Sequence, residues 1–307
     1  MQPISSDSTS KGSPKRLGIL GFGHLGQFLY QSLQQEQQQQ VNPDYELVFI
    51  WNRSREAFRQ YNENIDQALI VSTIEEGLER LPDLVVEVAH PDVLEKYAEK
   101  ILDVADLFIG SPTSLAKASL EKGLRSKTVE SGHAIYIGAG AFWGADDIAK
   151  MNERKTLRAL KVTMKKHPES FKLNEPLHSQ LQNQMKEQGS AKGKIIVYSG
   201  PVRDLCPLAP NNVNTMAIGA IVASNLGFDG VEGCLIADSS LSDRHVIEIE
   251  VTGPRTNIPN HEPLDFYVKT VRNNPAPLGL VTGIGTLMSF FSSLKRANGR
   301  TSGIYVV

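Results

Sequence analysis

A short apolar run followed at once by three glycines is the feature that most constrains the fold of this chain. The run at residues 16–20 leads into "GFGHLG", which has the spacing G-x-G-x-x-G, and an amphipathic segment follows. In a strand–turn–helix unit the first glycine permits a tight turn and the second lets the backbone approach a pyrophosphate. The third glycine allows helix and strand to pack closely. The pattern predicts a dinucleotide-binding turn, whose residues are Gly21, Gly23, His24, Leu25 and Gly26.

The rest of the first half alternates short apolar runs with helix-like segments. Continuous apolar strands separated by helices are typical of a parallel sheet that is covered on both faces. Six such runs predict a doubly wound α/β sheet. The predicted strands are residues 16–20, 46–51, 68–72, 84–89, 107–110 and 134–138. The glutamine-rich tract at 34–40 is expected to extend the first helix into solvent.

The second half has a different pattern. Several of its strand-like segments alternate apolar and polar residues, which suits a largely antiparallel sheet with two different faces. The predicted strands are residues 156–166, 194–200, 230–238, 244–253 and 263–272, with a buried small-residue helix over 211–228. The fold class is therefore an N-terminal Rossmann-type sheet plus a C-terminal α+β domain. The expected division is a disordered tail (1–15), a dinucleotide-binding domain (16–142), a substrate domain (143–277) and a C-terminal helix segment (278–307) that can return to the first domain.

Composition excludes several classes of protein. A net charge of −2 over 307 residues gives no basic footprint for nucleic acid or a membrane surface. The two cysteines neither form a disulfide framework nor have the spacing of a metal site. The polar, serine-rich N-terminus lacks the apolar core of a signal peptide, and no apolar stretch is long enough to span a membrane. We expect a cytoplasmic protein that acts on a small molecule and forms a homo-oligomer.

The residues after the second predicted strand bear on the choice of cofactor. An acidic residue at this strand end would bind the 2′-hydroxyl of NAD. Here Asn52 and Arg53 follow the strand instead. Asn52 retains the ability to bind a ribose hydroxyl, and Arg53 is suited to a 2′-phosphate unless it is an ordinary surface residue. The sequence favours NADP, or dual use with NAD.

Six segments together resemble the L-aspartate dehydrogenases, particularly the animal aspartate dehydrogenase domain-containing proteins. The segments are "GFGHLGQ", "WNRSRE", "PDLVVEVAHP", "GAFWGADD", "APNNVNTMA" and "LIADSSLSDRHVIEIEVTGP". The resemblance covers nearly everything after residue 15. It implies NAD(P)-dependent oxidative deamination of aspartate to oxaloacetate and ammonia, through iminoaspartate.

The resemblance also assigns individual residues. It places the family's cofactor-contacting alanine at Ala141 and its cofactor asparagine at Asn214, with Asn212 as a competitor for that role. It places the active-site histidine at His245. The segment "MKKHP" corresponds loosely to a strand end of the prokaryotic members, which makes Lys166, together with Asn212, a candidate substrate contact.

The chemistry needs a group that handles protons near neutrality and cationic partners for two carboxylates. His245 suits the first need. As part of a strand, however, it shares a face with Ile247, Ile249 and Val251, so it is alternatively a packed core residue. Position alone suggests further carboxylate contacts, which are Lys165, Lys166, Arg203, His90 and Ser111. His90 is alternatively a helix-entry residue before Pro91.

Two other readings of the function stay open. One is another two-domain Rossmann reductase, of the homoserine dehydrogenase or dihydrodipicolinate reductase type. The other is a regulatory protein that binds NAD(P) without turnover.

Overall fold

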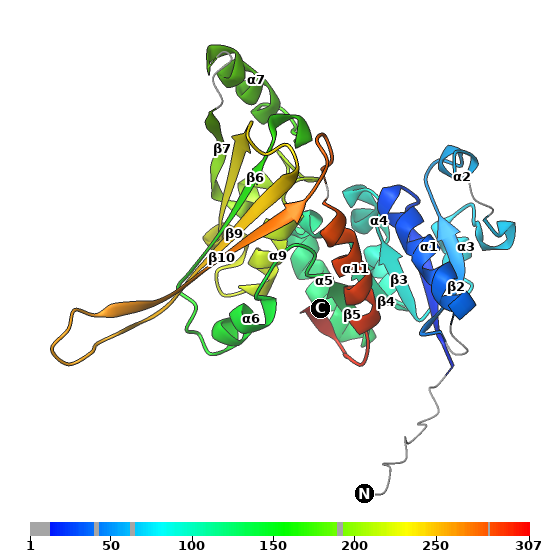
Figure 1. Ribbon diagram of the computed structural model, residues 1–307. Helices are drawn as coiled ribbons and strands as arrows, with labels where there is room; N and C mark the ends of the chain where they lie inside the picture. Colours follow the sequence, from blue (N-terminus) through cyan, green and yellow to red (C-terminus); the bar gives the residue numbers. More distant parts are fainter. Residues whose placement is uncertain (1–12, 40–42, 62–64, 189–192, 282) are drawn as a thin grey trace, which may run out of the picture.

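The computed structural model of the protein describes residues 13–39, 43–61, 65–188, 193–281 and 283–307 (Figure 1). Residues 1–12 of the predicted tail, and Gln40 of the glutamine tract, lie outside the described residues. The remainder of that tract lies in helix α1 (His24–Gln39), as expected.

The first sheet is parallel throughout. Its strands are β1 (Lys15–Leu20), β2 (Tyr45–Trp51), β3 (Leu84–Glu87), β4 (Asp106–Ile109), β5 (Ala134–Ile137) and β11 (Gly303–Val306). Their order is β11-β5-β4-β3-β1-β2. Strand β2 therefore lies on one side of β1, and β3, β4, β5 and β11 follow in order on its other side. This is a doubly wound Rossmann-type sheet. The predicted α/β fold of the first half is confirmed.

The second sheet is mixed and mostly antiparallel. Its strands are β6 (Ala159–Lys166), β7 (Lys194–Pro201), β8 (Glu232–Asp238), β9 (Arg244–Thr256) and β10 (Leu264–Pro275). In the order β10-β9-β6-β8-β7, only β6 and β8 run parallel. All five strands were predicted from the apolar patterns. Strand β9 continues to Thr256, beyond its predicted end, into a hairpin with β10 that projects from the body (Figure 1), and β10 continues to Pro275 at its other end, away from the hairpin.

Helices cover both sheets. They are α2 (Glu56–Arg59), α3 (Ile74–Leu78), α4 (Pro91–Leu102), α5 (Ala118–Ser131), α6 (Ala145–Glu153), α7 (Leu177–Gln188), α8 (Val202–Leu205), α9 (Asn214–Val222), α10 (Gly227–Gly230) and α11 (Ile284–Arg296). Three short 3₁₀ helices complete the described elements, and these are η1 (Gln67–Leu69), η2 (Pro112–Ala116) and η3 (Pro168–Ser170). None of the helices in these ranges is long and apolar enough to cross a bilayer.

The C-terminal helix returns to the first domain. Phe290 and Leu294 of α11 are buried in the same apolar cluster as Leu17 of β1 and Leu29 of α1. The Tyr45 hydroxyl donates a hydrogen bond of 2.7 Å to the carbonyl oxygen of Leu294. The helix begins at Ile284, whereas the sequence placed the start of this segment near residue 278.

A second apolar cluster joins the two sheets. It runs from the face of the first sheet under α4 and α5, through η2, to α9 against the second sheet. Every residue of α9 after Asn214 is buried, and most are small or aliphatic, so the helix packs closely on the sheet. The segment predicted as one helix over 211–228 forms α9 and the separate turn α10.

One predicted strand is wrong, and one real strand was not predicted. The apolar run 68–72 forms the end of η1 and only a single bridge, between Ile70 and Ile50. Local caps compete with strand formation there, because Asp66 accepts a hydrogen bond from the Ala68 amide and Thr73 accepts one from the Glu76 amide. The sixth strand of the sheet is β11, which pairs with β5.

Candidate active site

The glycine turn lies at the carboxyl end of β1, where a ligand approaches a parallel sheet. Gly21 has a φ of +107°, and a Cβ there would lie 2.7 Å from the backbone of Val88. A Cβ on Gly26 would lie 2.1 Å from the Gly21 carbonyl oxygen. The fold itself therefore requires these two glycines. A Cβ on Gly23, in contrast, meets no atom within 4 Å, so the backbone there faces open space in front of α1.

Asn52 connects the end of β2 to this turn. Its Oδ1 accepts a hydrogen bond of 2.9 Å from the Phe22 amide, and its Nδ2 donates one of 2.7 Å to the Ser54 carbonyl oxygen. Arg53, beside it, is exposed. Asn52 thus orders the backbone of the glycine turn, while Arg53 is open to solvent and to a ligand.

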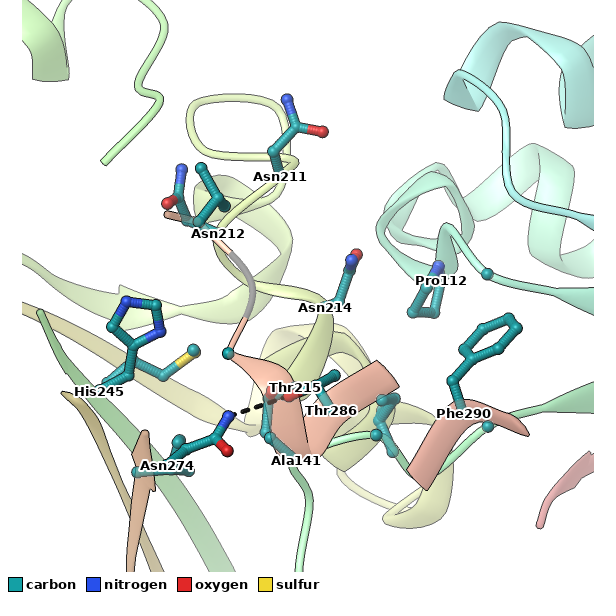
Figure 2. A pocket seen from close by; sticks show the side chains of 18 of the residues that line it. Pro112, Ala141, Asn211, Asn212, Asn214, Thr215, His245, Asn274, Thr286 and Phe290 are labelled. Atoms are coloured by element: carbon teal, nitrogen blue, oxygen red, sulfur yellow. Dashed lines mark hydrogen bonds between the residues drawn. The ribbon is translucent and has the colours of Figure 1, made fainter. Parts of the chain in front are cut away.

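A cavity of about 110 Å³ lies between the two sheets and α11 (Figure 2). The second sheet contributes the ends of β6 and β9 and Asn274 of β10. The first domain contributes Leu25, the end of β4 and the loop after β5. Six residues predicted from the sequence meet at this cavity, and they are Leu25, Ala141, Lys166, Asn212, Asn214 and His245.

His245 is buried on β9, with an exposed fraction of 4%. It faces the same way as Ile247, Ile249 and Val251, as the strand pattern predicted, and both His245 and Ile247 line the cavity. Its Nε2 has no hydrogen-bond partner among the described residues. Burial, and secondarily the charge of Lys166, lowers the pKa of His245 to about 4. The imidazole is therefore neutral near pH 7, with one nitrogen unsatisfied at the cavity.

Lys166 is the last residue of β6 and is only 1% exposed. Its Nζ donates hydrogen bonds to the Val281 carbonyl oxygen at 3.0 Å and to Asn212 Oδ1 at 3.4 Å. Asn212 is held in turn, because its Nδ2 donates a bond of 2.6 Å to the Lys172 carbonyl oxygen. Burial lowers the pKa of Lys166 to about 7.

Asn214 begins α9 at the edge of the cavity, and its Oδ1 is buried without a partner among the described residues. Ala141 lies opposite, in the loop after β5, where Arg272 of β10 donates a hydrogen bond of 3.2 Å to the Gly140 carbonyl oxygen. The unpartnered oxygen of Asn214 accepts hydrogen bonds only, so it suits a ligand group that donates, such as a carboxamide. Together with the open space at Gly23, these residues fit a nicotinamide dinucleotide that runs from the glycine turn into the cavity.

Two family models match the chain. The model described as the C-terminal part of aspartate dehydrogenase matches residues 147–297, and the model described as the NAD-binding domain of homoserine dehydrogenase matches residues 21–138. An aspartate dehydrogenase domain-containing protein of Xenopus tropicalis is 44% identical over 95% of this chain and 97% of the relative. The chain belongs to the family of aspartate dehydrogenase domain-containing proteins.

More distant relatives are named L-aspartate dehydrogenase, and a solved structure of an aspartate dehydrogenase has a similar fold. An L-aspartate dehydrogenase of Methanococcoides burtonii is 25% identical over 92% of this chain and 96% of the relative. The crystal structure of aspartate dehydrogenase from Thermotoga maritima superposes with a TM-score of 0.60 at 18% identity, over 92% of this chain and 94% of that one. The family resemblance seen in the sequence is confirmed. The chain has the architecture of a dehydrogenase with a nicotinamide-cofactor domain.

In this member of the family, the remaining candidates for carboxylate contacts lie outside the cavity. Lys165 points to the other face of β6, where it pairs with Glu248, and Arg203 pairs with Asp229. His90 caps α4 by accepting a hydrogen bond of 3.4 Å from the Asp92 amide, which is the helix-entry role considered for it. The last of these candidates, Ser111, donates hydrogen bonds to Glu87 through its amide and its hydroxyl.

Two residues at the site had no signal in the sequence. Glu87 is fully buried at the end of β3, and burial raises its pKa to about 7 although the Ala89 and Ser111 amides donate to it. Through these hydrogen bonds, Glu87 connects the loop after β3 to the loop after β4. Asn274 pairs with His245 in the register of β10 and β9, and its Nδ2 donates a bond of 3.0 Å to Thr286 Oγ1 (Figure 2).

Proposed function

We propose that this protein catalyses the NAD(P)-dependent oxidative deamination of L-aspartate to oxaloacetate and ammonia, through iminoaspartate. The observation that carries the proposal is the cavity itself. It brings the unsatisfied Nε2 of His245, the buried amino group of Lys166 and the unsatisfied Oδ1 of Asn214 to one place beside the glycine turn. An amino acid with two carboxylates offers anions for the lysine and an amine for the histidine.

The cofactor would lie with its pyrophosphate at Gly23 and its nicotinamide near Asn214 and Ala141, and it would supply the hydride acceptor. Asn52 and Arg53 would face the ribose that is joined to adenine. Two residues of this cofactor turn, His24 and Leu25, lie at the start of α1, and Leu25 reaches the cavity. Lys166 and Asn212 are assigned to the substrate.

His245 is the residue that we assign to the proton transfers. Oxidation leaves an imine at the substrate Cα, and water must then add to that carbon and lose a proton. A neutral imidazole with a free Nε2 accepts this proton and returns it to the departing ammonia. Ile247, Met164 and Phe290 give the cavity apolar walls.

The stoichiometry of the products tests the proposal. Purified protein incubated with aspartate and oxidised cofactor is expected to release ammonia, oxaloacetate and reduced cofactor in equal amounts. Reduced cofactor without ammonia would indicate a different dehydrogenase, such as one of the homoserine type. Cofactor binding without any reduction would indicate the regulatory protein.

The choice between NADP and NAD is expected to depend on Arg53. NADP is expected to be accepted at least as well as NAD, because Arg53 is exposed beside the ribose position and Asn52 takes the place of the acidic residue that would oppose a 2′-phosphate. Arg53→Ala is expected to weaken NADP binding by about 1.5–3 kcal/mol, the range for one charge-assisted contact, and to leave NAD binding unchanged. Titration calorimetry with both cofactors measures this difference.

Arg55→Ala is the matched control, because Arg55 lies nearby but its guanidinium donates a bond of 2.6 Å to Ser72 Oγ. We expect it to leave the ratio of the two affinities unchanged. Equal losses for both cofactors in Arg53→Ala, or no loss, would remove Arg53 from the 2′-phosphate.

A further inference from the structure

The cavity has an unusual balance of charge. Of the described residues that line it, only Lys166 and His245 are ionisable, and the others are apolar, glycine or uncharged polar residues. His245 is neutral near pH 7, so Lys166 is the lining residue that can carry positive charge in this pH range. No carboxylate among these lining residues balances it. A cavity of this composition attracts an anion and rejects a cation.

Lys166 is buried without a counter-ion among the described residues. Its Nζ contacts two neutral oxygens, of Val281 and Asn212, and the ring of Phe171 lies 6.0 Å away. Removing an ammonium from water without a paired anion destabilises a folded protein. A ligand that brings a carboxylate to Nζ compensates for that cost.

The adjacent residue shows that this burial is not a general property of the strand. Lys165 lies on the opposite face of β6, where Glu248 pairs with it. Two successive lysines therefore have opposite environments, one paired on the outer face and one unpaired at the cavity. Asn212 further restricts Lys166, because its own amide is fixed to the Lys172 carbonyl oxygen.

We propose that Lys166 receives the side-chain carboxylate of the substrate, and that it takes up a proton as that carboxylate binds. The assignment rests on the proposed function for the identity of the substrate. It makes Lys166 the residue that distinguishes aspartate from an amino acid of the same size with an uncharged side chain.

The proton uptake follows from the environment of Lys166 in the free protein. Burial lowers its pKa to about 7, so at pH 8 the amine is mostly neutral. A carboxylate at hydrogen-bond distance favours the charged form and raises that pKa. The ionisable residue that faces Lys166 from β9 is His245, whose pKa of about 4 keeps it neutral throughout this range. At pH 8, the protein is therefore expected to take up about one proton when the carboxylate binds.

Steady-state kinetics test the selectivity. Lys166→Met keeps the length of the side chain and removes its charge. It is expected to lower kcat/KM for aspartate by about 10- to 150-fold, the effect of one charge-assisted contact, and to change the value for asparagine by less than about threefold. Lys165→Met is the matched control and is expected to leave both values unchanged. Equal losses for aspartate and asparagine in Lys166→Met would contradict the assignment to the side-chain carboxylate.

Calorimetry with succinate tests the binding separately from turnover. Succinate has two carboxylates and no amine, and it is titrated into the protein saturated with oxidised cofactor, at pH 8, in buffers of different ionisation enthalpy. The wild-type protein is expected to take up a proton when succinate binds. Above pH 7, its affinity for succinate is expected to decrease with pH, with a limiting slope of about tenfold per pH unit. Lys166→Arg is expected to bind without that uptake, and Lys166→Met is expected to bind poorly. Proton-independent binding by the wild-type protein would overturn the proposal.

The two hypotheses fail in different ways. If aspartate is not oxidised, the proposed function fails, but succinate binding that depends on Lys166 still supports the anion site. If aspartate is oxidised and Lys166→Met has no effect, the inference fails and the proposed function stands. Thermal unfolding excludes a structural role, because loss of an unpaired buried charge is expected to leave the Tm of Lys166→Met equal to or above that of wild type. A lower Tm, with activity toward both substrates reduced alike, would contradict the proposal.

Discussion

Replacing His245 with alanine is expected to lower kcat by about 10²- to 10⁴-fold, the range for loss of a general acid–base group. The reason is that its Nε2 is buried at the cavity without a partner, while the ring is neutral near pH 7. Cofactor affinity is expected to stay unchanged, because we assign the cofactor to the glycine turn, Ala141 and Asn214. Steady-state kinetics, cofactor titration and thermal unfolding together measure these effects.

Ile249→Ala is the matched control for the alternative in which His245 only packs in the core. Ile249 lies on the same face of β9 and is 1% exposed, but it does not line this cavity. Its truncation is expected to destabilise the fold by about 2–5 kcal/mol while activity per folded molecule is retained. If His245→Ala behaves in that way, with activity following the folded fraction, the histidine has no catalytic role.

Replacing Gly23 with valine is expected to weaken dinucleotide binding by about a hundredfold or more, since the branched side chain would occupy the space that a pyrophosphate needs. The fold is expected to survive, because a Cβ at Gly23 meets no atom within 4 Å. Calorimetric titration of the cofactor and circular dichroism separate the two effects.

Gly26→Ala is the contrasting variant in the same motif. The Cβ of the new alanine would lie 2.1 Å from the Gly21 carbonyl oxygen. This clash is expected to distort the turn and lower the Tm, and cofactor binding is expected to weaken only as a result of the distorted turn. Unchanged cofactor affinity in Gly23→Val would mean that the glycines only form a turn.

The strands that could be predicted are those with local patterns. The buried parallel strands and the alternating strands of the second sheet both follow from the periodicity of apolar residues, and β9 also showed which way His245 would face. The prediction of a strand at residues 68–72 was wrong because these apolar residues lie between two local caps, at Asp66 and Thr73. Strand β11 pairs with β5, which precedes it by more than half of the chain length, and no local pattern indicates such a pairing.

The candidate site was predictable to a similar degree. The spacing of the glycines identified the turn, and the family resemblance pointed to Ala141, Lys166, Asn212, Asn214 and His245, which the structure brings to one cavity. Neither source indicated Glu87, which lies in an otherwise apolar strand. Asn274 was missed because its place opposite His245 depends on the register between β9 and β10.

Reduction of the cofactor by purified protein across a panel of substrates tests the central claim most directly. The panel contains aspartate, asparagine, glutamate and homoserine, each with NAD and with NADP. We predict that aspartate gives the highest kcat/KM with either cofactor, and that NADP is used at least as well as NAD. A higher kcat/KM for homoserine, or no reduction with any substrate by protein that binds the cofactor, would contradict the account.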